Sequence, residues 1–425
     1  MEVYNCTPPA IKEFPEGLFS RHQIENGAIA VHVLVTLYLF IAIATVCDEY
    51  FVPVVEKVCR ILHVPSDIGG ATFMATATSS PELFINIIGT FVTKGDIGLG
   101  TIVGSGVFNI LAVTAACGLT LAITGKELIL DWWPLTRDSL VYAISVCLLI
   151  GFLNDEKIEW YEAMTLVLVY LSYIVYLFFD KKVQGLFQGK NLVGGVAKSN
   201  EEIKVEEGES EDNSVSLWKW PRDISWIKQA LWFINWPINF LFFISIPNSE
   251  KLKSNFWIPI TFITCILWIG VLSYLLSWMI TVIGDILGIP DSVMGITFLA
   301  IGAGVPEAAS SIAVVKKGKG AMGISNSLGS NTFDILLCLG VPWLLKSTIV
   351  SKQKWVNINS SGLQYSTITL LITLVAFYLA LTFNKFKLNK FVGLYSLIIY
   401  VIFIILATLI ELNTFFVVNL PTCKE

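Results

Sequence analysis

Residues 72–111 read TFMATATSSPELFINIIGTFVTKGDIGLGTIVGSGVFNIL, and residues 297–336 read TFLAIGAGVPEAASSIAVVKKGKGAMGISNSLGSNTFDIL. The two stretches align without a gap. Both hold Pro-Glu in their first half, and both end in Gly-Ser followed by Phe and Ile-Leu. An internal repeat within apolar sequence predicts two membrane units that are built alike.

Each copy places its Pro-Glu pair, Pro81-Glu82 or Pro306-Glu307, inside an uncharged run long enough to cross a bilayer. A carboxylate at that depth costs about 2.5–3.5 kcal/mol on insertion scales, so it marks a functional site. The preceding Pro interrupts the helix, because it has no N–H to donate. Two such broken helices predict a cation site at the middle of the membrane.

The composition places the whole chain in a bilayer. Of its 425 residues, 55% are hydrophobic and 14% are charged, and the mean hydropathy is +0.70. The pattern predicts an all-α polytopic membrane protein with about ten transmembrane helices in two inverted repeats. A net charge of −5 argues against nucleic acid as a partner. No cleavable signal peptide is expected at the start.

The expected organisation has five parts, listed in chain order. They are an extracellular tail (1–28), a first membrane half (29–179, repeat 65–122), a cytoplasmic linker (180–255), a second half (256–412, repeat 290–345) and a short tail (413–425). The acidic stretch Glu201–Asp212 is interpreted as solvated linker. Ala230–Ile246 is predicted to lie in the interface, because a crossing there would make the repeats parallel. Asp48-Glu49 is predicted to end the first span, Ile29–Cys47.

The loop charges predict the orientation. With the N-terminus outside, Lys and Arg are about twice as frequent in the short cytoplasmic loops as in the outer ones. This orientation also puts the glycosylation candidates Asn5 and Asn359 outside. The eight cysteines show no metal-binding spacing. Only Cys6 and Cys423, near the two ends, are candidates for a disulfide.

Oxygen ligands for a hard cation surround each Glu in sequence. The Pro residues are expected to free carbonyls near Ala75 and Ala300. Thr78 and Ser79 add hydroxyls in the first copy only, since Ala303 and Gly304 replace them in the second.

The second helix of each copy carries a further pair of candidates one helical turn apart. Ser105 is followed by Asn109, and Ser330 is followed by Asp334. The alternative for the serines is a small residue that lets helices approach, and for Asn109 an interhelical hydrogen bond. Two carboxylates balance one divalent cation, and Asp334 would be a third.

These motifs resemble the two α-repeats of the potassium-dependent sodium/calcium exchangers over nearly the whole chain. The matching segments are GATFMA (70–75), SPELF (80–84), GDIGLGTIVGS (95–105), VFNIL (107–111), GITFLA (295–300), GSNTFDIL (329–336), GVPW (340–343) and, before the first repeat, CDEYFVP (47–53). The resemblance implies that Glu82 and Glu307 bind calcium and sodium, and that Asp334 binds potassium.

The chain departs from the family pattern around both acids. It has Ala77-Thr78 where the family usually has a Gly pair, Ala303-Gly304 where it has Thr-Ser, and Glu307 where it has Asp. The loss of two hydroxyls from the second half-site leaves the sodium stoichiometry and the ion preference open.

The expectation is therefore an antiporter in the plasma membrane, or in an intracellular one, that exchanges calcium and potassium for sodium. It is not expected to be an enzyme or to need a cofactor. A cation/proton antiporter is the first alternative. A cation channel and an intramembrane protease are the others, although the Tyr-Asp and Gly-x-Gly-Asp contexts of aspartyl intramembrane proteases are missing at both Glu positions.

Overall fold

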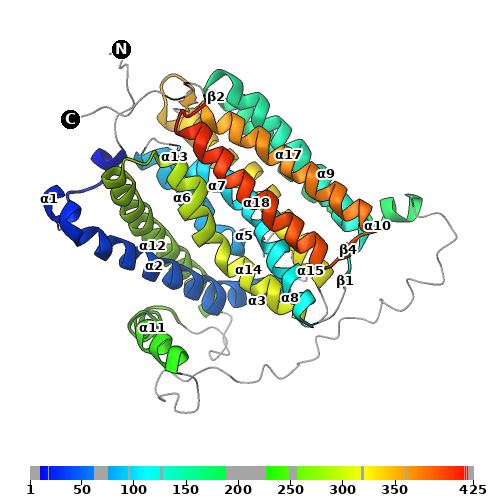
Figure 1. The fold of residues 1–425 in the computed structure, drawn as a ribbon, viewed down its shortest axis with the longest axis horizontal. Helices are drawn as coiled ribbons and strands as arrows, with labels where there is room; N and C mark the ends of the chain where they lie inside the picture. The colour runs from blue at the N-terminus through cyan, green and yellow to red at the C-terminus, as the bar shows by residue number, and fades with distance from the viewer. Residues whose placement is uncertain are drawn as a thin grey trace.

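The computed structural model describes residues 10–17, 19–61, 75–93, 96–124, 128–187, 226–247, 256–316, 320–358, 361–415, 417 and 419. Predictions for Asn5, Asn359, Cys6, Cys423 and Glu201–Asp212 fall outside these residues. The described part is a bundle of helices with two short strand ladders at its ends (Figure 1).

The first transmembrane helix is longer than the sequence predicted. It runs through α2 (Ile29–Val46), the π-helical turn η3 (Cys47–Phe51) and α3 (Val52–Ile61) without interruption. The prediction that the helix ends at Asp48-Glu49 is therefore wrong. Two acids carry no stop signal of the Gly or Pro kind, and the apolar residues resume directly after them.

Each repeat is a pair of interrupted helices. The first comprises α5 (Ala75–Thr78), α6 (Ser80–Ile88), η5 (Gly89–Thr93), α7 (Ile97–Val107), η6 (Phe108–Val113) and α8 (Thr114–Thr124). The second comprises α13 (Asp291–Met294), η9 (Gly295–Leu299), α14 (Ala300–Lys316), α15 (Gly320–Phe333), η10 (Asp334–Leu339), α16 (Gly340–Leu345) and η11 (Lys346–Val350).

Longer helices flank the repeats. They are α9 (Trp132–Phe152), α10 (Trp160–Phe187), α12 (Trp257–Leu287), α17 (Gly362–Phe383) and α18 (Lys390–Glu411), with α11 (Trp226–Ser245) between the two halves. The short segments are η1 (Ala10–Glu13), α1 (Arg21–Gln23), η2 (Ile24–Ala28) and η7 (Leu153–Asp155). Within the described residues, 8 helices are long and apolar enough to cross a membrane. The chain is a multi-pass membrane protein, and the broken segments 75–93 and 291–316 complete the predicted plan.

The two ladders mark opposite ends of the bundle. β1 (Leu128–Ile129) pairs antiparallel with β4 (Lys387–Leu388), and β2 (Lys157–Glu159) pairs antiparallel with β3 (Trp355–Asn357). Helix α9 leads from β1 to β2, and α17 leads from β3 back to β4 (Figure 1). The loops that the sequence assigned to one side of the membrane are thus paired with each other.

The repeats are inverted relative to each other. In η5, Lys346 Nζ donates to the Thr90 carbonyl, and Thr90 and Val356 line one small cavity, so η5 lies at the β2–β3 end. In the second repeat α15, which corresponds to α7, the helix after η5, contacts β1 at the opposite end. The inverted arrangement predicted from the sequence is confirmed.

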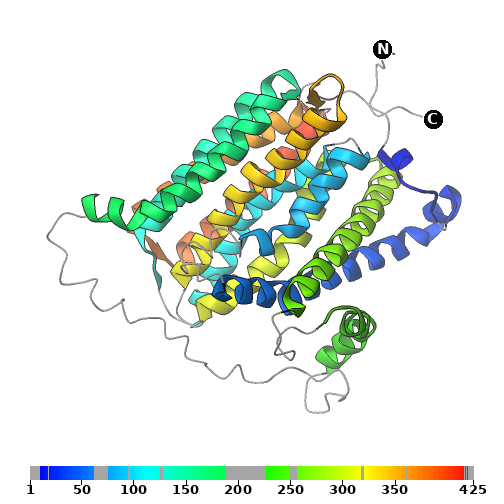
Figure 2. The same cartoon turned by 180° about the vertical axis from the view of Figure 1, so that it is seen from behind.

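Helix α7 lies at the centre of the bundle, and every one of its residues is buried. A Cβ at Gly100 would stand 2.8 Å from the Ser292 carbonyl, and one at Gly104 would clash with the Ile296 carbonyl. Gly at these positions therefore lets the backbones of α7 and the second repeat pack directly together. Seen from behind, α2 and α12 form a separate layer that slants past this core (Figure 2).

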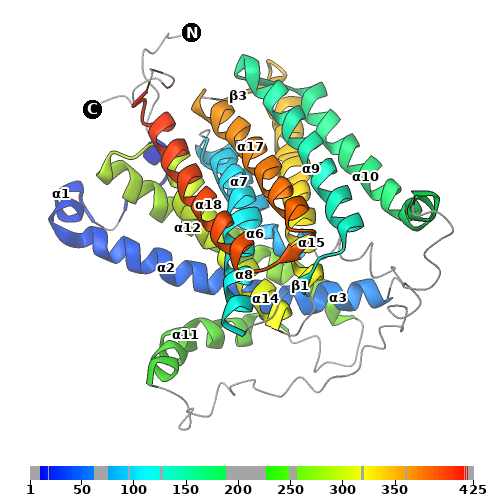
Figure 3. The same ribbon diagram turned by 45° about the vertical axis from the view of Figure 1, so that its right-hand side comes forward.

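Helix α11 rests against that slanted layer. Phe242 is buried between Tyr50 and Trp268, and the Trp268 indole N–H donates to Ser245 Oγ at 2.9 Å. Figure 3 shows α11 beside α2, at the edge of the bundle. Its location in the membrane interface stays a prediction.

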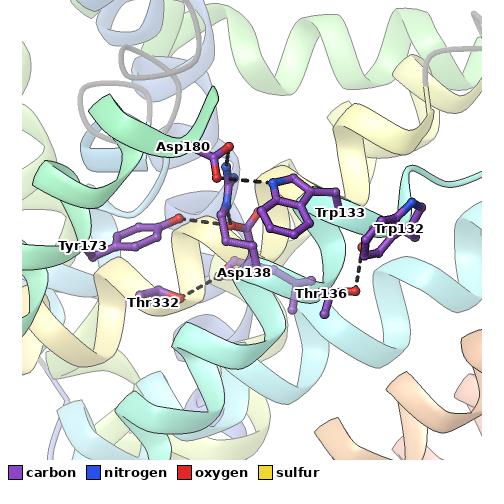
Figure 4. Close-up of polar contacts among 9 residues, drawn as sticks. Trp132, Trp133, Thr136, Asp138, Tyr173, Asp180 and Thr332 are labelled. Atoms are coloured by element: carbon purple, nitrogen blue, oxygen red, sulfur yellow. Dashed lines mark hydrogen bonds and ion pairs between the residues drawn. The ribbon is translucent and has the colours of Figure 1, made fainter. Parts of the chain in front are cut away.

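An ionic cluster joins α9 to α10 near the β1–β4 end (Figure 4). The Arg137 guanidinium contacts Asp138 and Asp180, each at 2.7 Å. The Trp133 indole N–H donates to Asp180 at 3.3 Å, and the Tyr173 hydroxyl donates to Asp138 at 3.2 Å. Three charged groups are thereby paired and hydrogen-bonded in a place where an isolated charge would be costly.

Candidate cation site

The first broken helix turns at Ser79. Its backbone dihedrals, φ −93° and ψ 12°, are not helical, although the ladder continues through the Ser79 N–H to Ala75 at 2.9 Å. Pro81 follows in the first turn of α6, where a missing N–H is tolerated. Glu82 therefore stands at the start of a helix, directly after the break.

The carbonyl that Pro81 frees is not the one that the sequence predicted. Ala75 O accepts both the Ser79 N–H and the Thr78 hydroxyl, the latter at 3.3 Å. Pro81 instead leaves Ala77 O without an amide donor, and the Ser80 hydroxyl donates to it at 2.9 Å. The freed carbonyl lies four residues before the Pro, so the prediction placed it two residues too early.

The second copy follows the same register, which points to the Gly302 carbonyl rather than to Ala300. Ala300 itself is buried at the start of α14. Ligand roles for the Ala75 and Ala300 carbonyls stay predictions.

Three buried carboxylates lie near one another between the repeats. Glu82 is 1% exposed, Asp334 2% and Glu307 8%, and they come from α6, η10 and α14. They lie close enough to interact electrostatically. Glu82 Oε2 has no hydrogen-bond partner within the described residues. Buried like charges of this kind are costly unless a cation or protons join them. Among the described residues, no three His, Cys, Asp or Glu side chains converge closely enough to form a metal cluster.

At the three carboxylates, the helices of one repeat pack against helices of the other. Helix α6 packs against η10 and α14 packs against η6, so each Glu-bearing helix meets the second helix of the other repeat. Glu307 lies beside Ser330 and Asn109, and Asp334 lies beside Ser79. Together with Glu82, these five predicted residues lie in one place, and both repeats contribute to the site.

The serine hydroxyls point their hydrogens at the backbone. Ser105 donates to Ile102 O at 3.2 Å, and Ser330 donates to Ser327 O at 3.0 Å. A hydroxyl that donates to a carbonyl keeps its oxygen lone pairs available for a cation. Thr78 faces a cavity that also contains Glu307.

The sequence missed two buried amides. Asn331 accepts from Asn109 Nδ2 at 3.0 Å, so Asn109 does make the interhelical hydrogen bond that was the alternative to a ligand role. The Oδ1 atom of Asn109 has no hydrogen-bond partner among the described residues, so it is available as a cation ligand. Asn86, one helical turn after Glu82, donates to Cys338 O. The signals were present: Asn331 directly follows Ser330, and Asn86 shares a helix face with Glu82.

Tyr142 was also missed. It is fully buried on α9, and its hydroxyl, which has no hydrogen-bond partner in the described part of the chain, lies against Gly106. It is near enough to Asp334 for an electrostatic interaction. A lone Tyr in an apolar helix looks like ordinary core in the sequence, so only the fold reveals this position.

The family model and the relatives that match this chain are all described as exchangers. The family model described as "Sodium/calcium exchanger protein" matches residues 32–179 and 257–409. Sodium/potassium/calcium exchanger 4 of Mus musculus is 35% identical over 99% of this chain and 88% of its own length. Sodium/potassium/calcium exchanger 5 of Homo sapiens is 35% identical over 96% of this chain and 89% of its own.

A solved structure of the sodium-calcium exchanger NCX_Mj is 20% identical, with a TM-score of 0.48, and the match covers 88% of this chain and 97% of that one. The extent of the family match and the identity to the curated relatives settle the assignment: this chain belongs to the sodium/calcium exchanger protein family.

Proposed function

We propose that this protein is a secondary-active antiporter that moves calcium, together with potassium, in exchange for sodium by alternating access. The observation that carries the proposal is the meeting of Glu82, Glu307 and Asp334 between two inverted repeats. The names of the relatives, sodium/potassium/calcium exchangers, support the choice of ions.

Glu82 and Glu307 are the shared ligands in this proposal. Together they balance one divalent cation, and carboxylate, hydroxyl and amide oxygens are the ligands that calcium and sodium take in proteins. Ser105, Asn109 and Ser330 supply neutral oxygens, with Thr78 and Ser79 on the first copy's side. Because calcium and sodium would use the same two carboxylates, they compete, and competition at one site is what couples their movements.

Asp334 supplies a third negative charge. With calcium on the two glutamates, this charge is balanced only if a monovalent cation joins. Potassium fits the names of the relatives. A proton would fit the same position; exchange against sodium would then stand, and the dependence on potassium would not. In the cation/proton alternative, protonation of the glutamates replaces sodium as the counter-ion.

The inverted repeats give the physical basis for alternation. The turn of the first repeat lies at the β2–β3 end and that of the second at the β1–β4 end, so the two halves present similar surfaces to opposite sides. A site between such halves opens to one side or the other when one half tilts against the other.

Direct binding tests the shared site. Purified full-length protein should bind radiolabelled calcium, and sodium should displace it competitively. Potassium should raise the calcium affinity of the wild type. Calcium binding that sodium leaves unchanged would contradict the shared site. Calcium affinity that varies steeply with pH but ignores potassium would show that Asp334 binds a proton and not potassium.

A further inference from the structure

One face of the continuous helix formed by α2 and η3 lines a cavity next to the cation site. The residues on that face recur at helical spacing: Phe40, Ile43, Ala44, Cys47 and Asp48. The cavity has a volume of about 40 Å³. Since one water needs roughly 10–15 Å³ measured in this way, the space admits a small cation with part of its hydration shell.

The opposite wall belongs to both repeats. Thr78 and Pro81 come from the broken helix of the first, and Gly302, Ala303 and Glu307 come from α14. The cavity therefore reaches a carboxylate of the cation site directly, and Thr78 lies on the same wall.

Phe40 lines this space where α2 approaches α14. Its ring lies against Gly302, where any side chain on α14 would clash with it.

Asp48 follows Phe40 by two helical turns, in η3, and lines the same cavity. It is exposed, and within the described residues it makes no ion pair. Its neighbour Glu49 is also exposed but does not line the cavity. Thus one of two adjacent acids faces the path to Glu307 and the other does not.

We propose that this cavity is the route by which cations reach Glu307 and that Asp48 captures them at its mouth. The inference rests on the proposed antiport function and adds an entry route and a capture residue to it. An unpaired carboxylate at the rim of a low-dielectric cleft raises the local cation concentration and can speed association by about 10- to 1,000-fold. Salt screens this attraction over about 10 Å at 0.1 M.

The two acids provide a matched pair of variants. Initial calcium flux is measured against calcium concentration for wild type, Asp48→Asn and Glu49→Gln, in vesicles of both orientations. From the side that the mouth faces, Asp48→Asn should raise the KM for calcium by roughly three- to tenfold at low salt and leave kcat unchanged. Glu49→Gln should stay close to wild type.

Ionic strength separates capture from a packing defect. In about 0.5 M choline chloride the KM difference between Asp48→Asn and wild type should shrink to within a factor of about two. A KM for Asp48→Asn equal to that of Glu49→Gln would overturn the proposal, as would a KM increase that salt leaves unchanged.

A second measurement needs no transport. Ala44→Cys, on the cavity face, should react with a small cationic thiosulfonate faster than Thr45→Cys, which lies outside the lining, and Asp48→Asn should slow only the Ala44→Cys reaction. Rates are taken as the increment over the parent chain, because Cys147 is exposed. Equal rates at the two positions would reject the route. A wild type without sodium-driven calcium flux would instead reject the proposed function and leave this accessibility result intact.

Discussion

Asn331 donates a 3.2 Å hydrogen bond to the carbonyl oxygen of Gly106, the residue that holds the same position in the first repeat. Asn331 also accepts from Asn109, at 3.0 Å. Gly106 and Asn331 therefore occupy equivalent positions in the two repeats and contact each other. Gly106 has no side chain, and its carbonyl accepts the hydrogen bond from the Asn331 side-chain amide. The bridge joins the two halves at the depth of the three carboxylates.

The small size of Gly106 is required by Tyr142. A Cβ at position 106 would collide with the Tyr142 hydroxyl. We expect Gly106→Ala to destabilise the protein by about 1–3 kcal/mol, the usual cost of overpacking. Tyr142→Phe removes the colliding oxygen, which has no hydrogen-bond partner in the described residues, and should restore most of that loss in the double variant. Thermal unfolding in detergent measures all four proteins of the cycle, and additive losses would contradict the contact.

The two glutamates should each be indispensable. In Glu82→Gln or Glu307→Gln a neutral amide replaces half of the charge that balances calcium. Losing one partner of a buried charge pair costs about 3–5 kcal/mol, which corresponds to a roughly 10²- to 5 × 10³-fold loss of calcium affinity. Calcium flux should fall with it.

The matched control for these variants is Glu411→Gln. Glu411 is 1% exposed and accepts hydrogen bonds from Ser292 at 2.7 Å and Asn419 at 3.0 Å, away from the cation site. The Glu411→Gln variant should keep sodium-driven calcium flux when it is expressed at the level of the wild type. Near-normal flux in either site variant would refute the site assignment.

Asp334→Asn should remove the response to potassium. The variant makes the second repeat match the first, which has Asn109 at this position, and it deletes the third charge. We expect calcium flux to persist at a reduced level and to become the same with and without potassium. Flux as potassium-dependent as that of the wild type would show that Asp334 does not bind potassium.

The sequence predicted this architecture well where the order of apolar and charged residues and the positions of Pro decide it. Pro81-Glu82 and its copy, inside apolar runs, predicted both the broken helices and the paired carboxylates. It failed where tertiary packing decides. Asp48 continues a helix that its charge suggested would end, and its cavity exists only because α2 packs against α14. Tyr142 approaches Asp334 only because Gly106 lets α9 come close, which no local pattern encodes.

The side of the membrane that each turn faces can be tested by labelling. Lys94→Cys and Lys319→Cys lie next to Thr93, the last residue of η5, and Gly320, the first of α15, which belong to opposite ends of the bundle. The Lys and Arg distribution predicts Lys94 outside and Lys319 inside. A membrane-impermeant maleimide should label the first in intact cells and the second only after permeabilisation. Labelling of both from one side would contradict the inverted arrangement.

Calcium uptake into vesicles that contain the purified protein is the decisive test of sodium-driven calcium transport. Sodium-loaded vesicles are diluted into sodium-free buffer with labelled calcium, with and without potassium, at fixed pH and with the membrane potential clamped. We expect calcium uptake that requires the outward sodium gradient and that potassium on the calcium side strongly increases. Uptake that proceeds equally without a sodium gradient, or that a proton gradient drives in its place, would contradict this expectation.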